Sequence, residues 1–214
     1  MAQKFEKALK QHMAWLHQQH ETWSWTTWQM LSGEHFGEYG ISSFNHRWKD
    51  FDAHAEFSEA ERAHWEATVA PYTEKITCMF YKERPELSYD KLQNPPPKYQ
   101  GLKFVHVKLQ GTTEFAEAVK KMQEALEKTN VVGGSLWYQM IRGAEHPLYL
   151  WVMPMKSLDE LEPPPGKSVP ELVLQYYGQK EGMPVLEAME KTVQVYNSEI
   201  SRTRPELSYA PTEH

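Results

Sequence analysis

The chain has 214 residues, of which 40% are hydrophobic and 13% aromatic, and a formal net charge of −6. This composition excludes an intrinsically disordered chain, which is poor in aromatic residues, and the negative charge gives no electrostatic support for nucleic-acid binding. No apolar run approaches the roughly 18 residues that a transmembrane helix needs, and the polar start does not suit a signal peptide. We therefore expect a soluble protein with no nucleic-acid or membrane partner. A cytoplasmic location is slightly favoured, although composition does not determine the compartment.

The first half of the chain predicts helices and strands in alternation. Its periodicity indicates one helix and three strands, at residues 2–20, 23–31, 39–46 and 76–82. Between the last two strands, Ser58 and Glu61 have the spacing of a capping box, which predicts the start of a second helix. The single cysteine, Cys78, excludes an intrachain disulfide. Its neighbours are apolar, so we expect a buried and inert thiol.

The second half predicts a complete βαββαβ unit. Strands are indicated at residues 102–109, 135–141, 148–153 and 193–202. A helix that begins near Thr112 carries apolar residues at helical spacing, namely Phe115, Ala118, Val119, Met122, Ala125 and Leu126. Ser168 and Glu171 form a second capping box. The helix that follows it should be interrupted by Gly182 and Pro184.

An internal repeat relates the two halves. The hexapeptide Arg-Pro-Glu-Leu-Ser-Tyr begins at Arg84 and again at Arg204, and a shift of 110 residues aligns Gln29 with Gln139. The strand at residues 102–109 has no counterpart ahead of the first helix, so the first repeat lacks its first strand. We expect a first ferredoxin-like repeat at residues 1–93, a Pro-rich linker at 94–100 and a second repeat at 101–214.

The element order, the duplication and the aromatic strands resemble the dimeric α+β barrel superfamily in its duplicated form. That superfamily includes the antibiotic-biosynthesis-monooxygenase-like, EthD-like and NIPSNAP-like families and the chlorite-dismutase-like haem proteins. The resemblance implies an α+β fold in which the two repeats close into one pseudo-symmetric barrel. Helices would cover its outside, and sheet residues would line a cavity for a ligand or haem. Because no catalytic motif accompanies the resemblance, it concerns the fold and not the function.

Period-two alternation predicts which strand residues line that cavity. Aliphatic residues such as Leu148 and Val152 are expected to face the helices, which leaves the aromatic residues of the same strands facing the cavity. The predicted ligand-binding residues are His46, His106, Trp25, Gln29, Phe44, Trp137, Gln139, Tyr149 and Trp151. An aromatic wall with a few polar groups suits a small apolar or aromatic molecule. The alternative is that these rings fill the barrel and leave no cavity.

Three functions remain open at this point. The first is binding of a small apolar or aromatic ligand, with oxidative turnover as the enzymatic form; the residues assign no catalytic group. The second is haem binding, with His46 or His106 as the axial ligand. The third is a non-catalytic assembly module, a homodimer included, that uses sheet edges and exposed tryptophans. No metal site is expected, and Arg84 and Arg204 are expected to be structural, pairing with glutamates across a repeat interface.

Overall fold

Helices and antiparallel strands together place the protein in the α+β class. The computed structural model describes residues 1–91, 97–131, 133–145, 147–162 and 167–211. These residues form two compact units. The first unit contains residues 1–29 and 38–77 and the chain from Thr203 onward, and the second contains residues 30–37 and 78–202.

The first unit packs helices against a short strand pair. Its elements are α1 (Ala2–Gln18), β1 (Thr26–Met30), β2 (Tyr39–Ser42), α2 (Trp48–Ala53), α3 (Ala55–Thr68) and the short 3-10 helices η1 (Ala70–Tyr72) and η5 (Pro205–Leu207). Strands β1 and β2 pair antiparallel. Phe5, Leu9 and Leu16 recur on one face of α1 and pack with Val69 and Leu207 in a buried core. Burial of this apolar stripe is what holds the helix to the rest of the unit.

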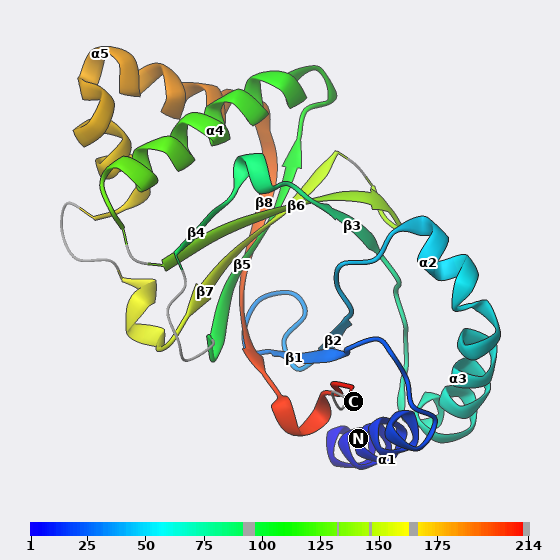
Figure 1. Cartoon of the computed structure of the whole chain (residues 1–214). Helices are drawn as coiled ribbons and strands as arrows, with labels where there is room; N and C mark the ends of the chain where they lie inside the picture. The colour runs from blue at the N-terminus through cyan, green and yellow to red at the C-terminus, as the bar shows by residue number, and fades with distance from the viewer. Residues whose placement is uncertain (92–96, 132, 146, 163–166, 212–214) are drawn as a thin grey trace. The chain divides into compact units, whose positions relative to one another are not determined.

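The second unit is an antiparallel sheet covered by two helices. Its strands are β3 (Phe80–Glu83), β4 (Tyr89–Lys91), β5 (Tyr99–Val107), β6 (Gly133–Arg142), β7 (Leu148–Met155) and β8 (Val193–Thr203). Its helices are η2 (Pro85–Leu87), η3 (Leu109–Gly111), α4 (Thr112–Lys128), η4 (Leu158–Leu161) and α5 (Val169–Thr192). The strands are hydrogen-bonded in the order β8-β5-β7-β6-β3, and β4 also pairs with β6. Helices α4 and α5 lie side by side over one face of this sheet (Figure 1).

Most predicted elements are confirmed, although the strands expected at 39–46 and 76–82 are shorter, and two corrections concern helices. Ser168 and Glu171 form the predicted capping box of α5. Ser58, however, lies inside α3, because that helix already begins at Ala55, two residues after α2 ends at Ala53. The break in α5 falls at Gly178, whose φ of 73° is non-helical, whereas Gly182 and Pro184 lie within the continuing helix. A left-handed φ without a steric penalty is available to glycine, so Gly178 turns the chain.

The repeated hexapeptide explains why the two units cross the boundary between the sequence repeats. The copy that begins at Arg84 belongs to the second unit, and the copy that begins at Arg204 belongs to the first. Each copy therefore packs with strands and a helix from the other half of the chain. Residues 94–96 of the expected linker lie outside the described residues.

The predicted orientation of the faces is reversed for β6 and β7, whereas on β5 Val105 and Val107 face the helices as expected. Tyr149 and Trp137 pack against Phe115 of α4, with ring centroids 4.9 and 5.6 Å away, so these aromatic residues face the helices. Cross-strand register places Trp151 on the same face as Trp137. Alternation showed correctly which residues share a face, but the large aromatic rings, and not the aliphatic residues of β7, meet the helix.

The burial of Cys78 and the character of the helices were also predicted from the sequence. Cys78 is exposed and not buried, because it lies ahead of β3 and outside the ladder. Among the described residues, no helix is both long enough and apolar enough to cross a membrane.

Candidate functional site

The hexapeptide that begins at Arg84 is held to the sheet by its own backbone and short side chains. The Arg84 N–H donates to the Trp137 carbonyl at 2.9 Å, which continues the β3–β6 ladder. Ser88 Oγ donates to the Arg84 carbonyl at 2.8 Å and accepts from the Trp137 N–H at 2.9 Å. Leu87 is buried in the core of the unit, and the Tyr89 hydroxyl donates to the Val131 carbonyl. These contacts fix the position from which the Arg84 side chain projects.

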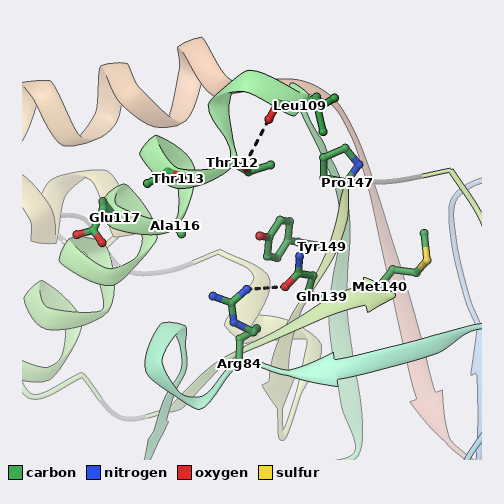
Figure 2. A pocket seen from close by; sticks show the side chains of 10 residues that line it. All are labelled: Arg84, Leu109, Thr112, Thr113, Ala116, Glu117, Gln139, Met140, Pro147 and Tyr149. Atoms are coloured by element: carbon green, nitrogen blue, oxygen red, sulfur yellow. Dashed lines mark hydrogen bonds between the residues drawn. The ribbon is translucent and has the colours of Figure 1, made fainter. Parts of the chain in front are cut away.

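Arg84 projects into a shallow, open pocket of about 410 Å³ between α4 and the sheet. That volume lies within the range of small-molecule sites, roughly 300–1,000 Å³. The pocket is lined by Arg84, Leu109, Thr112, Thr113, Ala116, Glu117, Gln139, Met140, Pro147 and Tyr149. Figure 2 shows Arg84 joined to Gln139, with the Tyr149 ring beside them and the first turns of α4 opposite. Gln139 and Tyr149 are directly paired across β6 and β7, which brings both onto the face that α4 covers.

The polar groups of the pocket are organised around the guanidinium of Arg84. Its Nη1 donates to Gln139 Oε1 at 2.6 Å, and its Nε donates to Glu86 Oε1 at 2.5 Å. Burial acts against the charge, but the hydrogen bond with Glu86, the Glu86 carboxylate and Tyr149 raise the pKa of Arg84 above its ordinary value. The pocket therefore contains a fixed cation whose side chain is only 20% exposed. A fixed, partly desolvated donor of this kind recognises an anionic or strongly accepting ligand group.

The first unit contains the same arrangement around Arg204. Arg204 Nη1 donates to Gln29 Oε1 at 2.7 Å, and its Nε donates to Glu206 at 2.6 Å. Here, however, Nη1 also donates to Glu6 Oε1 at 2.8 Å, and the Tyr39 hydroxyl donates to the same oxygen at 2.6 Å. The hydrogen bond from Arg204, and then that from Tyr39, lower the pKa of Glu6. In this unit a side chain of the protein therefore occupies the place beside the guanidinium.

Of the predicted binding residues in the second half, Gln139 and Tyr149 line the pocket. Trp137 is fully buried and stacks on Trp151 with ring centroids 5.0 Å apart, and the Trp151 Nε1–H donates to Ser135 Oγ. The two tryptophans are core residues behind the pocket and are not exposed to it. His106 lies one position along β5 from Val105, which pairs with Tyr149, so it belongs to the opposite face of the sheet.

The predicted residues of the first half do not meet in one cavity. Trp25 packs on the core of the first unit, Gln29 binds Arg204, and Phe44 is 48% exposed. His46 stacks on Trp23, with ring centroids 3.7 Å apart, and its Nε2 lies 2.6 Å from Ser43 Oγ. Burial lowers the pKa of His46.

Among the described residues, no three His, Cys, Asp or Glu side chains gather so that they could hold a metal ion. Glu21 is buried and binds the ring of His54, with Nε2 at 3.0 Å from both carboxylate oxygens. A second histidine pair, His12 and His64, has its Nδ1 atoms 2.9 Å apart between α1 and α3. These contacts join elements of the first unit.

Sequence reasoning missed the central residue of the pocket, because Arg84 was expected to pair across a repeat interface. Arg84 instead pairs with Glu86 of its own hexapeptide. Arg204 pairs with Glu206 in the same way but also with Glu6 of the first repeat, so only this arginine makes the expected pair between the repeats. The signal that could have found the pocket is the repeat itself. The shift of 110 residues that aligns Gln29 with Gln139 also aligns Tyr39 with Tyr149 and Glu6 with Ala116. Because the glutamine and the tyrosine recur together with the arginine of the hexapeptide, the repeat indicates the same arrangement of side chains in both units.

Comparison with known proteins bears on the fold. No family model and no curated protein matches the chain. A candidate monooxygenase from Lactobacillus acidophilus NCFM matches with a TM-score of 0.55 and 13% identity, over 98% of this chain and 89% of that one. An anthrone oxidase-like protein matches with a TM-score of 0.56 and 12% identity, over 94% and 85%. The chain shares the α+β fold of these two structures. At these identities the likeness concerns the fold alone.

Proposed function

We propose that the protein binds a small organic molecule in the pocket between α4 and strands β6 and β7. The observation that carries this proposal is the fixed Arg84–Gln139 pair beside Tyr149, in a hollow that Ala116 is too short to fill. Apolar lining from Leu109 and Pro147 suits the body of an aromatic or aliphatic ligand, and a few convergent polar groups would set its orientation. The duplicated barrel expected from the sequence is the architecture we assign to this binding protein.

Binding can be tested with a panel of small aromatic compounds, measured by ligand-observed NMR. Ala116→Leu should fill the pocket and weaken binders of the wild-type protein about tenfold or more. Ala60→Leu is the matched control, because Ala60 is an exposed alanine of α3 in the other unit. The proposal fails if no compound binds, or if the binders are unaffected by Ala116→Leu.

Oxidative turnover is the second function we propose, because the similar structures are described as a candidate monooxygenase and an anthrone oxidase-like protein. In the pocket, Arg84 would stabilise negative charge that develops on a substrate oxygen. Anthrone is the probe: its oxidation by one O₂ gives anthraquinone and one water. Oxygen uptake and the absorbance of the quinone should rise with the wild-type protein and fall with Ala116→Leu. If oxygen uptake never exceeds that of buffer, turnover of this substrate is excluded and binding remains to be judged by NMR.

A further inference from the structure

The two arginine centres differ at one position of their helices. Helix α1 spans Ala2–Gln18 and α4 spans Thr112–Lys128, so the shift of 110 residues aligns both ends of one helix with those of the other in the sequence. Buried residues recur at matching positions on both, with Phe5 and Phe115 as the first pair. Residue 6 in the first repeat is a glutamate, and the matching residue 116 in the second is an alanine.

The first repeat shows what this framework accepts beside its arginine. The Glu6 carboxylate takes hydrogen bonds from Arg204 and from the Tyr39 hydroxyl. Arg204 holds this carboxylate and that of Glu206 at the same time, so the nearby Glu206 does not prevent the binding of a second anion.

The second repeat keeps the donors and lacks the internal carboxylate. Arg84 retains its contacts with Gln139 and Glu86, and Tyr149 lies where Tyr39 lies in the first repeat. Ala116 lines the pocket at the position from which Glu6 reaches its arginine. The open volume beside Arg84 is therefore the volume that a protein carboxylate fills in the other unit.

We infer that the pocket of the second unit recognises a small carboxylic acid, whose carboxylate binds Arg84 and Tyr149 as Glu6 binds Arg204 and Tyr39. This inference rests on the proposed binding function and specifies the class of its ligand. The apolar body of the acid would lie toward Pro147 and the mouth of the pocket near Leu109. Glu117, the acidic residue among those that line the pocket, is exposed, and in Figure 2 its side chain extends away from Arg84.

The test compares 2-naphthoate with its neutral analogue 2-naphthamide by titration calorimetry and ligand-observed NMR. Because an ionised partner strengthens a hydrogen bond about twofold in energy, the acid should bind at least about tenfold more tightly than the amide. In Arg84→Gln this ratio should fall to about one. Ala116→Glu retains Arg84 and provides the second variant: its introduced carboxylate should occupy the subsite, abolish the preference for the acid and leave the protein folded by circular dichroism.

The outcomes separate this inference from the proposed function. If acid and amide bind the wild-type protein equally well and neither binds Ala116→Leu, the pocket binds small molecules but the carboxylate inference is wrong. An unchanged preference for the acid in a folded Ala116→Glu would overturn it as well. If neither compound binds and the panel of aromatic compounds also fails, the proposed function is wrong.

Discussion

Replacing Glu6 by alanine tests whether the carboxylate at the arginine centre of the first unit contributes to stability as its contacts indicate. The variant loses one hydrogen bond from Arg204 at 2.8 Å and one from the Tyr39 hydroxyl at 2.6 Å. A hydrogen bond to a charged group contributes about 1.5–3 kcal/mol, and the 25% exposure of the Glu6 side chain reduces the ionic part. We expect a loss of about 2 kcal/mol in the free energy of unfolding. In a chain of this size that corresponds to a fall of roughly 4–8 °C in Tm.

Urea unfolding followed by tryptophan fluorescence measures this loss, and Lys4→Ala, an exposed change on the same helix, is the control. The pKa of Glu6 is lowered in the folded protein, chiefly by Arg204. Its contribution is therefore complete above the ordinary value of 4.5 and is lost as the pH falls through the lower, folded pKa. The difference between wild type and Glu6→Ala should shrink in acid. A Glu6→Ala protein as stable as Lys4→Ala at pH 7 would refute the reasoning.

Three further predictions concern the scaffold. Ser208→Ala removes the acceptor of the buried Thr27 N–H, so unfolding by urea should show a loss of about 1–3 kcal/mol. Gly33→Ala adds a Cβ at a φ of +84° that would lie 2.5 Å from the buried Glu199 side chain, and its Tm should fall by several degrees, whereas an unchanged Tm would contradict the geometry. Burial lowers the pKa of His64 below 6.5, so its neutral form is favoured in the folded state and stability should decline as the pH falls below about 6.5; in His64→Gln the urea midpoint should depend less on pH over this range.

Local patterns predicted most of the elements because helix and strand periodicities are properties of neighbouring residues. The apolar stripe from Phe115 to Leu126 corresponds to the buried face of α4. Aromatic and aliphatic residues alternate along β7, and periodicity alone does not say which set meets a helix. The deciding contact is between Tyr149 and Phe115, which are far apart in the sequence. The faces of β6 and β7 were therefore assigned in reverse.

The candidate site was only partly predictable for a similar reason. Gln139 and Tyr149 were expected to face a cavity away from the helices, and they instead line a pocket on the face that α4 covers. Arg84 joins them through the pairing of β3 with β6, a contact between segments about 55 residues apart. The match between Tyr39 and Tyr149 was not predicted from the sequence. Once pairing is known, the match is direct, because Gln29 pairs with Tyr39 as Gln139 pairs with Tyr149.

The placement of each hexapeptide in the unit built from the opposite half makes the two halves mutually dependent for folding. Leu87 completes the core of the second unit and Leu207 that of the first, and each is delivered by a strand from the other half. A chain cut within the Pro-rich segment would yield two fragments, and each would lack the hexapeptide leucine that completes its hydrophobic core. Neither should fold when expressed alone, and mixing them should restore a cooperative transition by fragment complementation.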